Sequence, residues 1–168
     1  MIAKFKISVF FILGLNFYLP AQEVNPNKLK NEAQEFAISY VKLYFNGDCE
    51  ETYSLMSESL IHFEKKDIKF FDKEKIKDRI CETYNKAVRD KSKSFDDYLQ
   101  IYETRIYSPY EFEEALDTKL PNTYIPKVTE FFFIGGYKKD SQEESFIWDD
   151  VFIFMVRKEH EKWLVVSI

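Results

Sequence analysis

The side chains with the clearest capacity for chemistry are two adjacent carboxylates, Asp149 and Asp150, in an otherwise apolar stretch from Phe146 to Val156. Neighbouring side chains of a strand point to opposite faces, so one carboxylate of the pair is expected among apolar neighbours. Burial would raise its pKa and let it act as a base or as a hydrogen-bond donor. The simpler interpretation, which we favour, places the pair at a bulge or strand end, in contact with water or a tyrosine hydroxyl.

Two tyrosines, Tyr40 and Tyr44, lie one helical turn apart in the N-terminal part of the chain. Their hydroxyls could line a pocket, with Trp148 or Asp150 facing them from the other side. These four residues are the candidate ligand-binding residues. A tyrosine at helical spacing on an apolar face is, however, more often part of the core than a ligand contact.

Both histidines are expected to be solvated, because His62 alternates with Ile61 and Phe63, while His160 lies in a charged turn. With two imidazoles and no clustered ligands, the sequence predicts no metal site and no cofactor. No pairing of serine or cysteine with histidine indicates a nucleophile, and no glycine-rich loop indicates phosphate binding. We therefore predict no catalytic residue.

Both cysteines, Cys49 and Cys81, belong to the part of the chain that would remain after export. An oxidising compartment allows two thiols to pair, so we expect a disulfide between them. Closing a loop of this length stabilises a fold by roughly 3 to 4 kcal/mol in the chain-entropy picture. The alternative is two buried free thiols.

Apolar spacing predicts three helices in the N-terminal half of the chain. The first begins at Pro26 and ends before Gly47, and a second, shorter one begins at Asp48 and carries Tyr53 and Met56 on one side. Asp72 can cap the third, which runs to about Lys91. The apolar face of the first helix consists of Leu29, Ala33, Phe36, Ala37, Tyr40, Val41 and Tyr44.

The C-terminal half changes to the pattern of strands. We predict a strand within 95–107, although the first turn of this stretch could also be helical, then a helical turn from Pro109 to Leu116, and then an antiparallel meander. Its three strands are expected at 128–137, 145–157 and 162–168. Both faces of these strands are apolar, so both must be covered. The helices can cover one face, and either strong curvature or a second subunit must cover the other, from which we predict a homodimer through the sheet.

The first 22 residues have the layout of a secretory signal: Lys4 and Lys6 precede an apolar stretch from Ile7 to Leu19. This stretch is shorter than a membrane span, so we expect cleavage after Ala21 or Gln22, with an uncleaved N-terminal anchor as the alternative. The product would be a periplasmic or secreted protein with no membrane span.

Residues 23–168 suffice for a single domain, and 45% of the chain is hydrophobic. Loss of two lysines with the signal would change the formal net charge from −5 to −7. An acidic chain without a basic stripe is a poor partner for nucleic acid or for anionic lipid.

The order of these elements resembles the NTF2-like (SnoaL-like, cystatin-like α+β cone) superfamily. The resemblance rests on AISYVKLYFNGDCEETYSLMSESLIHF, in which Gly47-Asp48 follows the first helix, and on KWLVVSI, in which Trp163 begins the final strand. It implies an α+β fold in which three N-terminal helices pack on a strongly curved antiparallel sheet. It also implies a pocket at the open end of the cone and frequent dimerisation. Some members are enzymes, such as ketosteroid isomerase and scytalone dehydratase, but none of their catalytic motifs can be placed here.

Two hypotheses for function follow. The first is an exported, non-catalytic module that binds a small apolar ligand or a protein partner in or around its cone. The second is a cofactor-free acid/base enzyme of the isomerase or dehydratase type, with a pocket Asp as base and a Tyr as acid. The first is favoured, because the interior is rich in aromatic residues and candidate acid/base groups are few.

Overall fold

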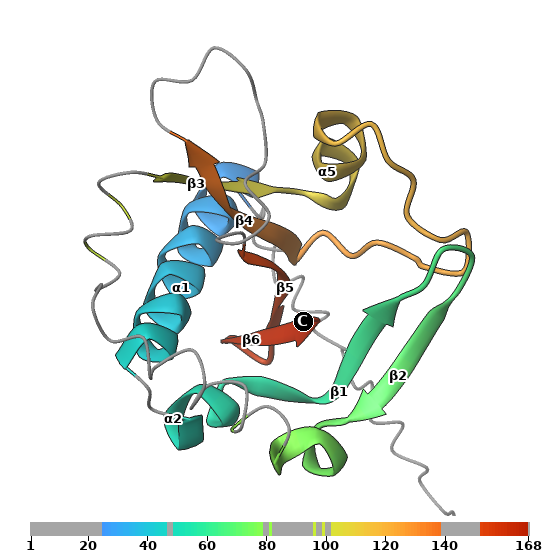
Figure 1. Ribbon diagram of the computed structural model, residues 1–168. Coiled ribbons are helices and arrows are strands. Elements are labelled where there is room, and N and C mark those ends of the chain that lie inside the picture. The colour runs from blue at the N-terminus through green and yellow to red at the C-terminus, as the bar shows by residue number, and fades with distance from the viewer. Residues whose placement is uncertain are drawn as a thin grey trace, which may run out of the picture.

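The computed structural model describes residues 25–46, 49–78, 81, 96, 99, 102–138 and 152–167. Within them the chain has an α+β architecture, in which an N-terminal helix lies on one face of a six-stranded sheet (Figure 1). The predicted signal segment, residues 1–22, lies outside the described residues. No helix among the described residues has the length and hydropathy required to cross a membrane.

Helix α1 (Pro26–Asn46) forms where the apolar spacing predicts it. Proline is well tolerated at the first helical position, and the Asn25 side chain accepts hydrogen bonds from the amides of Asn27 and Lys28 at 3.1 and 3.3 Å. The face that packs on the sheet buries Leu29, Ala33, Ala37, Tyr40 and Val41, which confirms the predicted stripe.

The second helix, α2 (Cys49–Ser54), is shorter than predicted, because the chain turns at Leu55 and enters the sheet at Met56. The Leu55 carbonyl accepts a hydrogen bond from the amide of Val165 at 2.9 Å, which draws this corner onto the last strand. The assignment of Met56 to the helix was therefore wrong: Met56 begins strand β1 (Met56–Phe63).

The charged run after β1 forms a strand that the sequence pattern does not predict, β2 (Ile68–Asp72). Asp72 acts as a cap, as predicted, and accepts a hydrogen bond from the amide of Glu74 at 3.0 Å. The element it caps is the short 3-10 helix η1 (Lys73–Ile76). Most of the predicted third helix, beyond residue 78, lies outside the described residues.

The C-terminal half confirms the predicted meander and the helical turn before it. The strand expected within 95–107 begins only at Tyr102, and the described residues ahead of it, Asp96 and Leu99, are helical, as the alternative allowed. Its elements are β3 (Tyr102–Tyr107), α5 (Pro109–Ala115), β4 (Glu130–Lys138), β5 (Phe152–Glu159) and β6 (Lys162–Ser167). Helix α5 starts with a complete capping box, in which Ser108 and Glu111 bond to each other's amides.

The sheet has the order β2-β1-β6-β5-β4-β3 (Figure 1). All neighbouring strands are antiparallel except β1 and β6, which run parallel. The predicted sheet, antiparallel throughout and strongly curved, was therefore wrong: the observed sheet is mixed and is not strongly curled. Among the described helices only α1 and α5 have seven or more residues, so the expected set of three N-terminal helices is confirmed only for α1 and the shorter α2.

Each face of the sheet supports its own hydrophobic cluster. On the first face, α1 packs on alternate residues of the strands, including Leu60, Phe133, Phe154 and Val165. On the second face, α5 and the segment 116–129 pack on the other set, including Ile61, Phe132, Ile134, Met155 and Val166. Both faces are therefore largely covered, as predicted, and the cover on the second face comes from the chain itself, with Ile153 left partly exposed. This internal cover explains why the sheet need not curl strongly.

Candidate functional site

An open groove on the second face of the sheet has a volume of about 680 Å³ and is lined by described residues. One wall is the turn between β1 and β2, the other is α5 with the segment that follows it, and the floor is formed by β4, β5 and β6. The groove is lined by His62, Phe63, Glu64, Lys65, Phe112, Leu116, Thr118, Lys119, Leu120, Pro121, Phe132, Ile153 and Ser167. We call it the second-face groove.

Helix α5 brings Phe112 to the wall of this groove. The capping box fixes the start of the helix, and Lys30 of α1 donates hydrogen bonds to the Glu111 carboxylate at 2.8 Å. Phe112, four residues after the N-cap Ser108, then stacks on Phe132 of β4 with ring centroids 4.1 Å apart. These contacts attach the wall to the floor of the groove.

The opposite wall is tied to the same floor through Phe63 at the end of β1. Its ring lies 5.6 Å from that of Phe132 and 5.2 Å from that of Tyr124. The β1–β2 turn is joined to the segment after α5 by a hydrogen bond of 2.8 Å from the Thr123 hydroxyl to Asp67. That bond is the main reason why the pKa of Asp67 is lowered.

The charges at the groove do not all have partners. Glu64 forms an ion pair with Lys69, and Lys119 lies 3.4 Å from the carboxylate of Glu113. Lys65 is exposed, and no ion pair of Lys65 is found within the described part of the chain. The groove thus combines an apolar floor with a lysine on each wall.

A buried polar cluster supports the sheet beneath the segment that covers the second face. Glu130 is 1% exposed and lies 2.8 Å from the Arg157 guanidinium, while its other oxygen accepts hydrogen bonds from the Tyr124 hydroxyl at 2.6 Å and the Lys127 amide at 2.8 Å. The pKa of Tyr124 is raised far above its usual range, mainly by burial and secondly by the hydrogen bond to the Glu130 carboxylate. Tyr124 therefore remains a protonated donor that holds the covering segment in place.

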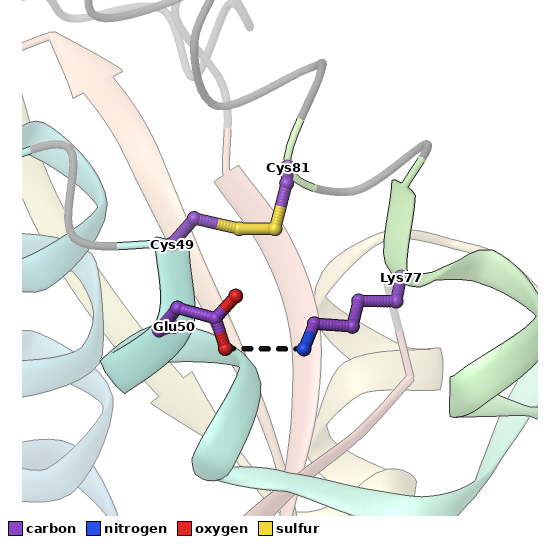
Figure 2. Close-up of a disulfide and its surroundings, with 4 residues drawn as sticks. All are labelled: Cys49, Glu50, Lys77 and Cys81. Carbon is purple, nitrogen blue, oxygen red and sulfur yellow. Dashed lines mark ion pairs between the residues drawn. A yellow bond between two sulfur atoms is a disulfide. The ribbon is translucent and has the colours of Figure 1, made fainter.

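The predicted disulfide between Cys49 and Cys81 is present and connects α2 to the segment after η1 (Figure 2). Their Cα atoms are 5.4 Å apart, within the normal range for a disulfide. Glu50 and Lys77, which flank the disulfide, form an ion pair of 3.1 Å across the same junction. The disulfide thus supports the fold and lies apart from the residues of the second-face groove.

A second charged cluster holds η1 against β1. Lys73 is buried, donates to the Met56 carbonyl at 3.1 Å, and lies over the ring of Tyr53. The Tyr53 hydroxyl donates to Glu74 at 2.5 Å, and this bond is the main cause that raises the Tyr53 pKa to about 12. Each polar group here has a protein partner, which fits a structural role.

The predicted ligand-binding residues are only partly visible. Tyr40 is buried in the first-face core with its ring 5.2 Å from that of Phe154, and Tyr44 packs against the same cluster, where burial raises its pKa. Trp148, Asp149 and Asp150 lie outside the described residues. The proposed convergence of an aspartate and a tyrosine is therefore not visible in the described structure.

Both histidines are exposed, as predicted. His62 nevertheless contributes to the lining of the second-face groove, and its ring packs edge-to-face with that of Phe71. His160 adopts positive φ in the turn between β5 and β6. Among the described residues no group of His, Cys, Asp and Glu has the arrangement of a metal site.

The second-face groove could not be predicted from the sequence, because its two walls come from segments that are far apart in the chain. The sequence does contain a signal for one wall, since Phe112, Leu116 and Leu120, which come after Pro109, are spaced four residues apart. Such spacing places apolar residues on one side of a helical turn. The other wall depends on the β1–β2 turn, which the charged run concealed.

Comparisons with family models, with curated proteins and with solved structures find no match to this chain.

Proposed function

We propose that this protein is an exported, non-catalytic module that binds a small apolar molecule with an acidic end in the second-face groove. The observation that carries the proposal is the groove itself: an open cavity of about 680 Å³ with an apolar floor and a lysine on each wall. Ligand pockets in proteins commonly have volumes of about 300 to 1,000 Å³ and are lined mainly by hydrophobic side chains.

The floor supports an apolar ligand because it leaves hydrophobic surface uncovered. Ile153 is 43% exposed, although Phe132, which lines the groove from the neighbouring strand, is buried. Covering such surface is favourable by about 25 cal/mol per Å² of apolar area. A ligand in the groove would continue the hydrophobic cluster that α5 and the following segment leave incomplete.

The acidic end is proposed from charge complementarity. Lys65 and Lys119 come from opposite walls, and Glu64, the acidic residue among the lining side chains, is already paired with Lys69. Lys119 lies 3.4 Å from Glu113, so Lys65 is the main candidate to bind the acidic end. An ammonium group attracts a carboxylate more strongly at the edge of an apolar surface than in bulk water. In a long-chain carboxylate, the apolar chain matches the floor and the carboxylate matches the lysines of the walls. A protein partner is the alternative ligand for this groove.

Export and family membership form part of the same proposal. The disulfide agrees with an oxidising compartment, and Trp163 stands near the start of the last strand, as the NTF2-like resemblance expects. The acid/base enzyme remains the alternative hypothesis. It requires Asp149 or Asp150 to face a tyrosine in a pocket, and both carboxylates lie outside the described residues.

The test of the floor is a calorimetric titration with dodecanoate. We expect saturable binding that Ile153→Glu weakens at least tenfold, because the new carboxylate lies on the floor of the groove. The matched control is Ile125→Glu, since Ile125 is 82% exposed and does not line the groove. Equal binding by both variants, or no binding by the wild type, would contradict the proposal.

The test of the acidic end compares Lys65→Ala with Lys66→Ala. Both lysines are exposed neighbours in one turn, but only Lys65 lines the groove. We expect Lys65→Ala to weaken dodecanoate binding several-fold and to leave the binding of neutral dodecanol unchanged. If the two variants behave alike, the groove does not select an acidic ligand.

A further inference from the structure

Strand β2 is an edge strand whose outer side offers hydrogen-bonding groups in a self-complementary order. It is the first strand of the sheet and pairs only with β1 among the described strands (Figure 1). Its two aromatic residues are both exposed, Phe70 by 63% and Phe71 by 40%. An exposed apolar edge of this kind readily pairs with another strand.

The register between β1 and β2 defines which backbone groups point outward. The amide of Glu64 donates to the Asp67 carbonyl at 2.9 Å, and Phe63 is opposite Ile68. Hydrogen-bonded and non-hydrogen-bonded pairs alternate in an antiparallel ladder. Ile68, Phe70 and Asp72 are therefore the residues whose amides and carbonyls face away from β1.

Two of these outward groups are already occupied. The Ile68 amide donates to the Asp67 side chain at 2.8 Å, and Asp72 is the N-cap of η1, a position whose carbonyl accepts the first bond of the helix. The groups that remain are the carbonyl of Ile68, both groups of Phe70, and the amide of Asp72. Among the described residues no partner is found for them.

We propose that a second copy of this chain pairs with β2 in antiparallel orientation, about a two-fold axis at Phe70. In this register the Phe70 amide and carbonyl bond reciprocally to Phe70 of the other copy. The Asp72 amide of each copy bonds to the Ile68 carbonyl of the other. Each outward backbone group that lacks a partner then forms a hydrogen bond to the other copy. The Ile68 amide and the Asp72 carbonyl keep their present hydrogen bonds, so the two strands can pair without rearrangement.

The side chains agree with this register. Phe70 lies on the same face as its partner Ile61, so the two Phe70 rings meet on one face of the joined sheet. Aromatic residues opposite each other in an antiparallel pair stabilise it. The strand has five residues, and such a small contact favours a reversible dimer that forms in a concentration-dependent way. This proposal is independent of ligand binding in the second-face groove.

The test is sedimentation of the full-length gene product, in the form that its expression host leaves it, from about 1 µM to about 1 mM. We expect the mass to rise from monomer to dimer. Phe70→Pro should remain monomeric throughout, because it removes the outward amide without breaking a bond to β1. Phe70→Thr keeps that amide and should still dimerise, with a dissociation constant raised less than about tenfold.

A wild type that is monomeric at about 1 mM would overturn the proposal, and so would a dimer that survives in Phe70→Pro. Loss of the dimer in Phe70→Thr would show that the aromatic ring, and not the backbone hydrogen bonds, holds the dimer together, and would also overturn the proposed strand pairing. If Phe70→Pro fails to fold, cysteine variants decide. Phe70→Cys should give cross-linked dimers on oxidation, since paired Cα atoms would be about 5.5 Å apart. Phe71→Cys, displaced along the strand, should not.

Discussion

At the scale of single residues, Glu130 is the carboxylate on which the second face depends most. It is buried and contacts Arg157, Tyr124 and the backbone of Lys127 at once. Removing one member of a buried ion pair leaves its partner charged and unpaired, which costs about 3 to 5 kcal/mol. We expect Glu130→Gln to lower the free energy of unfolding, measured in urea, by that amount.

Glu114→Gln is the matched control, because Glu114 is exposed on α5. Its free energy of unfolding should stay within about 0.5 kcal/mol of the wild type. A loss of similar size in both variants would mean that the buried cluster adds nothing beyond the general effect of charge.

Tyr53 gives a prediction for alkaline pH. Its pKa rises from the ordinary value of 10 to about 12, mainly because its hydroxyl donates to Glu74. A group whose folded pKa is raised stabilises the fold fully below the unfolded pKa and loses that contribution as pH rises through the folded pKa. The stabilising effect of Tyr53 should therefore disappear between pH 10 and pH 12.

The measurement is the ultraviolet titration of tyrosinate in the wild type, compared with Tyr53→Phe and Glu74→Gln. The phenol that Tyr53→Phe removes should be the one that titrates near pH 12, and Glu74→Gln should bring it back toward 10. An unchanged titration in Glu74→Gln would show that the carboxylate does not hold the proton.

At the scale of elements, the capping box of α5 determines how firmly one wall of the groove is held. Ser108 accepts a hydrogen bond from the Glu111 amide at 3.3 Å. Loss of a serine N-cap costs about 1 kcal/mol, so Ser108→Ala should lower the free energy of unfolding by about that much and speed hydrogen exchange in α5. Ser39→Ala, an exposed site inside α1, should cause no loss because alanine favours helix.

The disulfide stabilises the junction between α2 and the segment after η1. The double variant Cys49→Ser, Cys81→Ser should lose about 3 to 4 kcal/mol of unfolding free energy, because its unfolded chain is no longer restricted by the loop. Reduction of the wild type should have the same effect. Two free thiols in the native protein, found by thiol labelling before any reduction, would contradict the disulfide.

The predictability of the elements follows the strength of their local signals. Helix α1 could be predicted because its apolar residues recur every three or four positions, and α5 because Ser108, Pro109 and Glu111 form a recognisable start. Strand β2 could not, because it is short, lies at the edge and has charged residues on both sides. Its strand structure depends on pairing with β1, which no local pattern records.

The arrangement of the elements was harder to predict than their existence. The sequence indicates that both faces of the central strands are covered, and the structure confirms it. It does not indicate that β1 would pair in parallel with β6, because these two strands are far apart in the sequence and no local pattern connects them. The groove follows from this pairing, since it brings the β1–β2 turn opposite α5.

At the scale of the whole molecule, export gives a prediction about the length of the mature chain. Cleavage after Ala21 or Gln22 would leave an N-terminus at residue 22 or 23. The intact mass of protein purified from its own host should show that truncation. A chain that retains residues 1–21 would instead support the N-terminal anchor.

The proposed function depends above all on where an apolar ligand binds: in the second-face groove, or in the first-face core under α1. Amide chemical shifts recorded during a titration with dodecanoate distinguish the two places. We expect little change along α1 and shifts at the groove, in residues 62–65, Phe112, Leu116, 118–121, Phe132, Ile153 and Ser167. Shifts concentrated on α1 around Tyr40 and Tyr44, or a titration without saturable binding of dodecanoate, would contradict binding in the groove.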